Sequence, residues 1–157
     1  MTNDILKLML PAQHNYLEVV GTAVTNMLCT IPALENEAYN IQLAIHEACA
    51  NIIDHAFPQQ SGATFEVDLT VSSECGRFTA CLKDHGQAYE PCSTSSETQP
   101  VWTVCQTKPN CFKLTAVPEP GFDQIRGRGL FLMFNLVDQI TYHQINDRNE
   151  WTLTKKF

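Results

Sequence analysis

Basic residues are scarce in this sequence. It contains 10 lysines and arginines against 17 aspartates and glutamates, which gives a formal net charge of −7 at pH 7. A surface that binds nucleic acid needs a basic field to displace counterions, so this charge balance argues against nucleic acid as a direct partner. A protein partner with a basic surface is compatible with it.

Long hydrophobic runs are also missing. No stretch approaches the roughly 18 apolar residues that a membrane-spanning helix requires. The first residues, MTNDILKLML, lack the basic region and the long apolar region of a secretory signal. We therefore expect a cytoplasmic protein without a membrane partner.

The seven cysteines show no metal-binding or paired pattern. Their number is odd, and no two stand in a Cys-x-x-Cys arrangement. This argues against a zinc ribbon and against a complete disulfide framework. We expect reduced thiols, several of them buried. A redox role stays open for Cys92, Cys105 and Cys111, which fall in a predicted loop.

Several catalytic and nucleotide-binding motifs are incomplete or absent. The His-Glu pair at His46 would begin a zinc-peptidase motif, but that motif needs a second histidine where Ala50 stands. Gly127-x-Gly129 would begin a dinucleotide fingerprint, but its third glycine is replaced by Leu132. The chain also has no Gly-Lys-Ser/Thr P-loop and no His-Arg-Asp kinase loop. These absences exclude a zinc peptidase, a P-loop enzyme and a eukaryotic-type kinase.

The composition is that of a globular domain. The chain has 157 residues, 44% of them hydrophobic, so residues 1–157 predict one domain with its own core. Residues 90–125 are rich in Pro, Ser, Thr and Gln and predict one long loop. Hydrophobic periodicity predicts strands at 5–10, 64–71, 78–83, 139–145 and 150–157, and helices at 14–30, at 36–57 and from about 128. The fold class is therefore α+β, a two-layer sandwich in which helices cover one face of a mostly antiparallel sheet.

The predicted helix at 36–57 carries a polar arc. At about 100° per residue, Glu47, Asn51, Asp54 and His55 fall beside the apolar stripe of this helix rather than opposite it. Polar side chains at the border of a core either line a pocket or mark the water line, which is the boundary between the buried and the solvent-exposed side of the helix. The pattern by itself leaves both interpretations open.

Two further motifs have an ordinary and a functional interpretation. Asp84-x-Gly86 follows a predicted strand and is most often a turn, yet an aspartate in this place can accept a hydrogen bond from the exocyclic amine of a base. Gly127 and Gly129 open a predicted helix between two arginines. The backbone N–H groups there can hold phosphate, or the glycines serve only to start the helix.

The motifs are more specific in combination. A glutamate and an asparagine four residues apart on a helix provide a general base and an oxygen ligand for Mg²⁺. Followed by Asp-x-Gly, a long loop and Gly-x-Gly, they have the order of the GHKL (Bergerat) ATP-binding superfamily. Within it the chain resembles the anti-sigma-factor serine/threonine kinases nearly from end to end. The stretches that carry the resemblance are LKLMLPAQHNYLEVV, IHEACANIIDHAF, LKDHGQAYEP, RGRGLFLMFNLVDQITYH and WTLTKKF.

The resemblance implies a role for each motif. Glu47 resembles the general base that deprotonates the acceptor serine, and Asn51 resembles the ligand that connects Mg²⁺ to the phosphates. Asp84 resembles the residue that recognises the adenine amino group, with Gly86 giving the base room. The nucleotide-binding set implied in this way is Asn51, Asp54, His55, Asp84, Gly86, Ala88, Arg126, Gly127, Arg128, Gly129 and Leu130.

Some positions depart from the family pattern or stay open. Asp54 and His55 either contact phosphate or mark the water line. Ala88 stands where a second glycine is often seen after Asp-x-Gly, which narrows the pocket. The lid segment 90–125 is long for this family, and residues 149–152 replace a Gly-Thr pair found in many relatives.

The function that the resemblance implies is that of an ATP- and Mg²⁺-dependent regulator. It would transfer the γ-phosphate of ATP to a serine or threonine of a STAS-type anti-sigma antagonist and sequester a sigma factor. One alternative is a non-catalytic, ATP-dependent partner-switching module that acts on a phosphatase or another regulator. Another is a pocket that binds no nucleotide. By analogy with relatives, the first strand and helix would form a homodimer.

Overall fold

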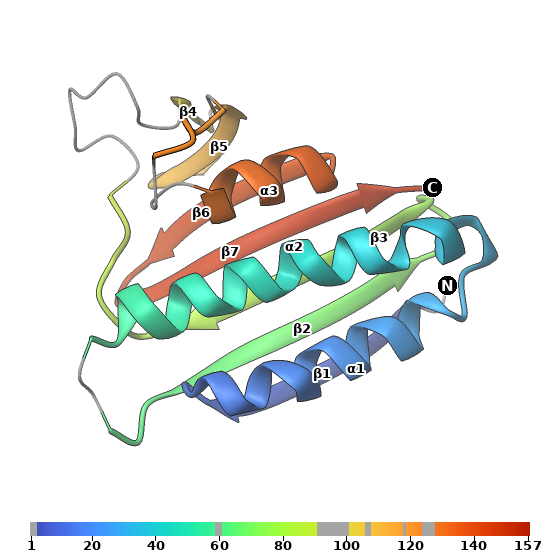
Figure 1. Ribbon diagram of the computed structural model, residues 1–157, viewed down its shortest axis with the longest axis horizontal. Coiled ribbons are helices and arrows are strands. Elements are labelled where there is room, and N and C mark those ends of the chain that lie inside the picture. The colour runs from blue at the N-terminus through green and yellow to red at the C-terminus, as the bar shows by residue number, and fades with distance from the viewer. Residues whose placement is uncertain (1–2, 59–60, 91–100, 106–107, 118, 124–127) are drawn as a thin grey trace.

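One antiparallel sheet organises the molecule. The computed structural model describes residues 3–58, 61–90, 101–105, 108–117, 119–123 and 128–157. Its seven strands lie in the order β1-β2-β3-β7-β6-β5-β4 (Figure 1). They are β1 (Asp4–Pro11), β2 (Thr64–Ser72), β3 (Arg77–Asp84), β4 (Val101–Val104), β5 (Cys111–Ala116), β6 (Gln139–Ile145) and β7 (Arg148–Lys156). The last strand, β7, therefore lies in the middle of the sheet, between β3 and β6.

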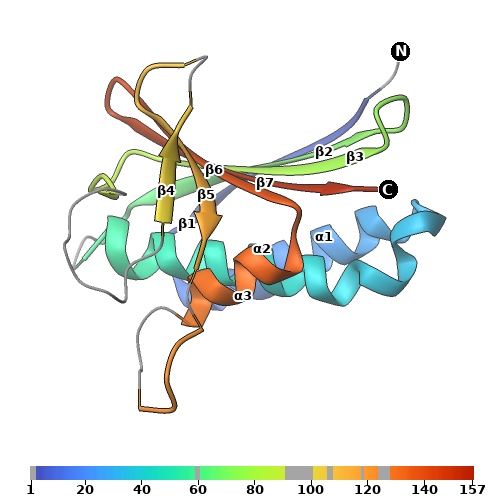
Figure 2. The same ribbon diagram turned by 90° about the horizontal axis from the view of Figure 1, so that it is seen from above.

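Three helices cover one face of this sheet, as Figure 2 shows from above. They are α1 (Leu17–Leu28), α2 (Ala38–Asn51) and α3 (Arg128–Leu136), and α2 packs between the other two. Short 3₁₀ turns at His14–Tyr16 and Pro32–Glu37 precede α1 and α2, and a π-helical turn at Ile52–Ala56 continues α2. The two-layer α+β sandwich predicted from the sequence is confirmed. No helix in the described part of the chain is long and apolar enough to cross a membrane.

The core lies between the two layers because alternate strand residues point toward the helices. On β2 the buried residues are Phe65, Val67, Leu69 and Val71, and on β3 they are Phe78, Ala80, Leu82 and Asp84. Helix α2 contributes a buried stripe at helical spacing, Ile41, Ala44, Ile45 and Ala48. A strand with one apolar face and a helix with one apolar stripe have to bury these surfaces against each other.

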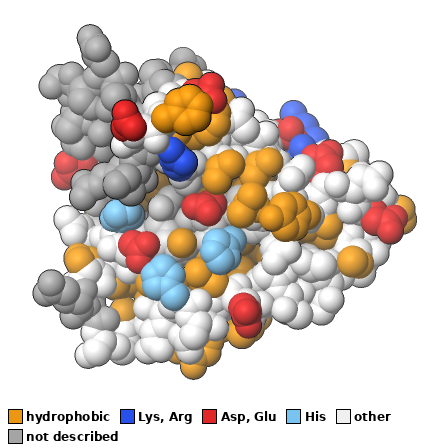
Figure 3. All heavy atoms as spheres, viewed as in Figure 1, with side chains coloured by type: hydrophobic (Ala, Val, Ile, Leu, Met, Phe, Trp, Pro, Cys, Tyr) orange, Lys and Arg blue, Asp and Glu red, His pale blue; other side chains and the backbone are white. Residues whose placement is uncertain are grey.

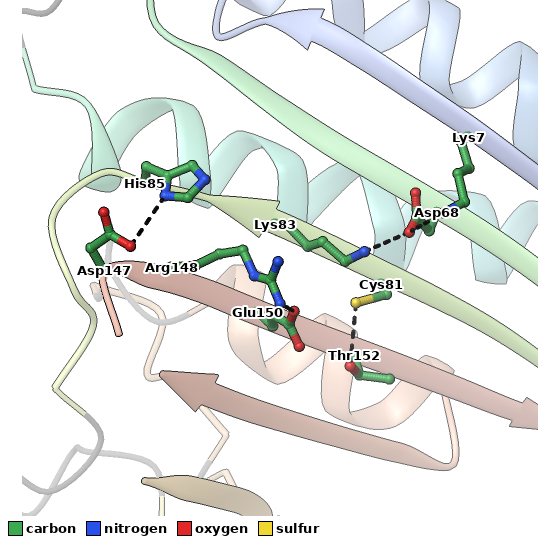
Figure 4. Close-up of polar contacts among 9 residues, drawn as sticks. All are labelled: Lys7, Asp68, Cys81, Lys83, His85, Asp147, Arg148, Glu150 and Thr152. Atoms are coloured by element: carbon green, nitrogen blue, oxygen red, sulfur yellow. Dashed lines mark hydrogen bonds and ion pairs between the residues drawn. The ribbon is translucent and has the colours of Figure 1, made fainter. Parts of the chain in front are cut away.

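The opposite face of the sheet is mostly polar, apart from the exposed Ile5 and Met9 on β1. Lys83 on β3 pairs with Asp68 on β2 at 2.6 Å, and on β7 Arg148 pairs with Glu150 at 2.6 Å (Figure 4). These residues alternate with the buried ones along each strand. An antiparallel sheet tolerates such a solvated face, so no second layer of helices is needed.

Part of the segment predicted as a loop forms strands. β4 pairs with β5, and β5 pairs with β6, so both extend the sheet at the edge opposite β1. The prediction of one continuous loop over 90–125 is therefore wrong for these two strands. Leu114 is buried and Trp102 packs against the core. Burial of these apolar side chains outweighs the polar composition of the segment as a whole.

The turn between β6 and β7 is shorter than predicted. Ile145 pairs directly with Arg148, which leaves two residues in the turn, and Asn146 there has φ 57°. Asparagine tolerates this left-handed conformation in two-residue hairpins. As a result Asn149, predicted to lie in the turn, becomes the second residue of β7 and faces the core.

Candidate functional site

A buried carboxylate marks the end of β3. Asp84 is 2% exposed, and its Oδ1 accepts two hydrogen bonds, from the backbone N–H of Gly86 and from Nδ2 of Asn149, both at 2.8 Å. Its Oδ2 accepts no hydrogen bond from any residue that the structure describes. Asp84 therefore has one oxygen fixed by the protein and a second that can accept a hydrogen bond from a ligand.

Asn149 is the centre of a buried hydrogen-bond network. Its Nδ2 also donates to the carbonyl of Gly86 at 3.1 Å, and its Oδ1 accepts from the hydroxyl of Tyr142 at 2.9 Å. The same hydroxyl accepts from the backbone N–H of Tyr89 at 3.0 Å. The network joins β3, β7 and β6 to the chain that follows β3, so the position of Asp84 is fixed from several sides.

Burial raises the pKa of the Asp84 carboxyl above its ordinary value of 3.8. The hydrogen bonds from Asn149 and Gly86, and the neighbouring His85, oppose this effect because they favour the charged form. Burial of Asp84 thus favours its protonated form, and the hydrogen bonds of the network together with His85 offset part of this effect.

Gly86 is required for packing between the sheet and the end of the helix. A Cβ at this position would lie 2.4 Å from the carbonyl oxygen of Ala56, in the π-helical turn. The next residue, Gln87, donates its N–H to the same carbonyl at 2.8 Å. The backbone of Ala56 therefore leaves no space for a side chain at position 86. That Gly86 also gives a base room stays a prediction.

Four aromatic rings pack together beside the network. Tyr89 lies 5.1 Å from Trp151 and 5.7 Å from both Tyr142 and Trp102, between ring centroids. Tyr142 and Trp102 each contact Trp151 as well, at 5.0 and 5.8 Å. Tilted and edge-on pairs at these distances are favourable arrangements for aromatic rings. This aromatic cluster, defined here as Tyr89, Trp102, Tyr142 and Trp151, connects β4 to the Asp84 network.

A second group of predicted residues meets where α2 faces α3. A Cβ on Gly129 would lie 2.8 Å from Oε2 of Glu47 and 3.7 Å from the side-chain amide of Asn51. Nδ2 of Asn51 donates to the sulfur of Met133, one turn further along α3, at 3.9 Å. The structure therefore brings together the acidic and amide side chains of α2 and the first turn of α3, as the motif order predicts.

Two residues of the polar arc have other surroundings. Oδ1 of Asp54 lies 2.7 Å from Nε2 of His14, in the turn that leads into α1, and both side chains are more than half exposed. His55 is exposed as well. A π-helical turn contains more residues per turn than an α-helix, so it rotates both side chains relative to Glu47 and Asn51. For Asp54 the water-line interpretation describes what is seen.

The remaining predicted residues are partly described. Arg126 and Gly127 lie outside the residues that the structure describes. Arg128 begins α3, and its Nη2 donates to the carbonyl of Phe122 at 3.1 Å. Ala88 and Leu130 are half-buried.

Asn149 and Tyr142 are site residues that the sequence interpretation missed. A signal for both is present, because Asn149 stands in phase with Trp151 and Leu153, the buried positions of its strand. A polar side chain at a core position needs hydrogen-bond partners, and Tyr142 on the neighbouring strand is one of them.

The surface above these elements is mixed in character. On the helical face, histidine and acidic side chains lie among hydrophobic ones, and lysine and arginine are sparse (Figure 3). On the helix that covers this part of the sheet, His46 is exposed and Glu47 and Asn51 are half-buried, and His55 in the following turn is exposed. A ligand that carries negative charge would therefore need a cation or backbone N–H groups to bind on this face.

Comparison with known proteins agrees with the geometry. Residues 10–155 match the family described as the histidine kinase-like ATPase domain. The chain is 22% identical over 141 residues to the serine-protein kinase RsbW of Bacillus pumilus. The aligned region covers 88% of this chain and 78% of that protein. The chain is 23% identical over 142 residues to RsbW of Halalkalibacterium halodurans, with coverages of 87% and 74%. The predicted resemblance to anti-sigma serine kinases is thus confirmed.

One solved structure shares the fold. It contains the RsbU and RsbW domains of a Mycobacterium tuberculosis protein, and the match has a TM-score of 0.61 at 18% sequence identity. The match covers 98% of this chain and 32% of that one, so the chain spans about a third of the solved chain.

Proposed function

Because the chain belongs to the histidine kinase-like ATPase domain family, we propose that it binds ATP between Asp84 and the contact of α2 with α3. We propose further that it transfers the γ-phosphate to a serine or threonine of a protein partner. The similarity to serine-protein kinases named RsbW supports this reaction. The observation that carries the proposal is the meeting of Glu47, Asn51 and Gly129 in one place.

In this proposal Asp84 recognises the adenine base. An exocyclic amine is a hydrogen-bond donor, and Oδ2 of Asp84 is an acceptor that no described residue uses. Oδ1 stays bound to Asn149 and Gly86, so the carboxylate is oriented before the nucleotide arrives. Pre-orientation of this kind lowers the entropy cost of binding.

The start of α3 holds the phosphates. Its backbone N–H groups and its dipole favour an anion, and Arg128 adds a positive charge at the first residue of the helix. Gly129 lets this helix approach Glu47 and Asn51. Phosphate held there lies beside the two side chains that the reaction requires.

The donor set near Asn51 fits Mg²⁺. Mg²⁺ prefers oxygen ligands, keeps several waters, and is held through one or two protein groups together with substrate phosphates. The amide nitrogen of Asn51 is turned toward the sulfur of Met133, which leaves its Oδ1 as the ligand atom. Bound there, Mg²⁺ would neutralise charge on the phosphates.

Glu47 acts as the general base. It accepts the proton of the serine or threonine hydroxyl while the hydroxyl oxygen attacks the γ-phosphorus and ADP leaves. Most of the rate enhancement comes from positioning, since phosphoryl transfer asks little covalent chemistry of the protein.

The proposed partner is a STAS-type anti-sigma antagonist, and the proposed regulatory role is sequestration of a sigma factor. Both follow from similarity to the RsbW kinases. We propose no direct contact with nucleic acid, because the net charge is −7.

A calorimetric titration with ATP, with and without Mg²⁺, tests the binding step. We expect binding that requires Mg²⁺ and weakens about tenfold or more in Asn51→Ala, which loses the oxygen ligand. Gln42→Ala is the matched control, because this amide lies on α2 but binds Thr25 on α1. Absence of ATP binding by the unmodified protein under both conditions would refute the proposal.

Phosphate transfer to a STAS-domain protein from labelled ATP tests the kinase step. Glu47→Gln should bind ATP and transfer no phosphate, whereas Glu18→Gln, an exposed glutamate on α1, should behave as the unmodified protein. Full activity of Glu47→Gln would refute its role as base. ATP binding without transfer in the unmodified protein would favour the partner-switching module instead.

A further inference from the structure

Two cysteines face each other across the end of the β4–β5 hairpin. Cys105 follows β4 directly and Cys111 is the first residue of β5. Val104 pairs with Phe112, so continuing this register places Cys105 opposite Cys111. The backbone N–H of Cys105 donates to the carbonyl of Cys111 at 2.7 Å, which confirms that the two residues are cross-strand neighbours.

Their thiols are in contact. Sγ of Cys111 donates to Sγ of Cys105 at 2.8 Å, and both cysteines are reduced in the structure. Directly opposed, hydrogen-bonded residues of an antiparallel pair have Cα atoms about 5.5 Å apart. Disulfides form at Cα separations of about 4.4–6.8 Å. A bond between the two sulfurs therefore needs little movement of the backbone.

The other described cysteines are not arranged in this way. Cys29 and Cys75 are exposed, and Cys49 is buried in the core. Cys81 accepts a hydrogen bond from Thr152. Among the cysteines that the structure describes, only Cys105 and Cys111 share a contact between their sulfurs.

We propose that Cys105 and Cys111 are a reversible redox pair that a small-molecule disulfide, such as an oxidised low-molecular-weight thiol, converts to an intramolecular disulfide. The bond would link the two sides of the β4–β5 hairpin next to the loop that connects them. Its formation does not depend on the proposed ATP binding.

The reaction is a pair of thiol–disulfide exchanges. Cys105 is the more exposed of the two, so its thiolate attacks one sulfur of the oxidant, forms a mixed disulfide and releases one thiolate. The thiolate of Cys111 then attacks Sγ of Cys105 and releases the second. In total the two cysteines lose two protons and two electrons, and the oxidant becomes two thiols.

The surroundings of Cys111 suit this order. Its pKa is raised to about 11, mainly by burial and also by the hydrogen bond to Cys105 and the charge of Cys105, while Lys108 lowers it. The protonated form of Cys111 is therefore favoured, so the first exchange takes place at Cys105, the less buried of the two. Conversion of Cys105 to a neutral mixed disulfide removes the charge that opposed ionisation of Cys111.

The pair is connected to the candidate site through Trp102. This residue is on β4, three positions before Cys105, and its ring contacts Tyr89 and Trp151 in the aromatic cluster. The backbone N–H of Tyr89 belongs to the Asp84 network. A covalent link that restricts the hairpin also restricts how Trp102 packs there.

Mass spectrometry after oxidation tests the proposal. The reduced protein is incubated with oxidised glutathione, its free thiols are blocked by alkylation, and the chain is digested with trypsin. The peptide 84–113 contains Cys92, Cys105 and Cys111, because Lys108 precedes a proline and resists cleavage. We expect this peptide to lose two hydrogen atoms, to carry one alkyl group instead of three, and to return to three after reduction.

Variants identify the bonded pair. Cys92→Ser should still form the bond, and Cys75→Ser, which removes an exposed cysteine elsewhere, should leave the reaction unchanged. Cys105→Ser and Cys111→Ser should each abolish it. Cys105 is the less buried of the two, so Cys105→Ser keeps the test valid even where Cys111→Ser impairs folding.

Two outcomes would overturn the proposal. One is a stable glutathione adduct on Cys105 that Cys111 never displaces. The other is a bond that disappears in Cys92→Ser. Tryptophan fluorescence gives a second readout, since oxidation should change the emission of the unmodified protein and leave that of Cys105→Ser constant.

Discussion

Gly129 faces the carboxylate of Glu47 so closely that a Cβ would lie 2.8 Å from Oε2. The contact joins the first turn of α3 to the polar arc of α2. The atom that a methyl group would meet is the far end of a flexible side chain, so the methyl group would displace Glu47 rather than the backbone.

Gly129→Ala should therefore lower activity without lowering stability. Alanine within a helix is favoured over glycine by up to about 1 kcal/mol, which offsets the cost of moving Glu47. A displacement of about 1 Å at a reacting group costs about 100-fold in rate. We expect an unchanged or higher melting temperature and phosphate transfer reduced about 100-fold, measured with labelled ATP and a STAS-domain partner. Normal transfer would show that Glu47 does not need its observed position.

Gly86→Ala, in contrast to Gly129→Ala, should lower the stability of the fold. Here a Cβ would lie 2.4 Å from the backbone oxygen of Ala56, which cannot rotate away. Overpacking of this kind costs about 1–3 kcal/mol. We expect a corresponding decrease in the free energy of unfolding in urea. Gly121→Ala is the control, because no atom of the described residues lies within 4 Å of its Cβ position, and an equal loss there would contradict the packing argument.

Asp84→Asn should stabilise the fold near neutral pH and weaken ATP binding. The pKa of Asp84 is raised by burial, so this group favours the native state fully below 3.8 and loses that contribution as pH rises through the native pKa. Asparagine keeps an acceptor at Oδ1 for Gly86 and Asn149 but carries no charge. We expect the variant to be the more stable protein at neutral pH, with the difference disappearing below 3.8.

The same variant should bind ATP about 10- to 100-fold more weakly, because an amide donor would face the donor of the base. Urea unfolding at the two pH values and calorimetry measure the two effects. A variant less stable than the parent at neutral pH would contradict the assigned cost of the buried charge.

Tyr142→Phe should destabilise the network while leaving the aromatic packing in place. The hydroxyl of Tyr142 donates to Asn149 and accepts from the N–H of Tyr89. Its loss leaves two buried groups without their partner, at a cost of about 2 kcal/mol in the free energy of unfolding. Tyr39→Phe is the control, because Tyr39 is 72% exposed and should show no change. Equal stabilities of the two variants would show that the network contributes little.

Asp54→Ala should leave ATP affinity unchanged. Its carboxylate pairs with His14 at the surface, and exposed pairs contribute about 0–1 kcal/mol. His14→Ala should therefore reproduce the small stability effect of Asp54→Ala in thermal unfolding. Weaker ATP binding in Asp54→Ala but not in His14→Ala would assign Asp54 to the nucleotide after all.

The sequence predicts the sheet and helices well where periodicity is strong. β2 alternates apolar and polar residues without a break, and α2 keeps its apolar stripe over several turns. These elements depend on local pattern, which the tertiary structure leaves intact. Glu47, Asn51 and Gly129 could be assigned to one site because the order of their motifs resembles that of the GHKL superfamily.

What could not be predicted depends on contacts between distant residues. The π-helical turn at Ile52–Ala56 changes the direction of Asp54, and no period in the sequence reports it. Gly86 is constrained by Ala56, a residue on another element. Asn149 becomes a buried hub because the β6–β7 turn closes with only two residues.

The central place of β7 has a consequence for the order of folding. β1, β2 and β3 form one half of the sheet and β6, β5 and β4 the other, and β7 alone joins them. Since β7 follows every other strand in the chain, a ribosome releases both halves before the strand that unites them. Asp84 is on β3 and Asn149 is on β7, so the network that orients the carboxylate requires the two halves of the sheet to be joined. A chain in which β7 is unpaired would therefore lack the oriented carboxylate on which the proposed recognition of ATP depends.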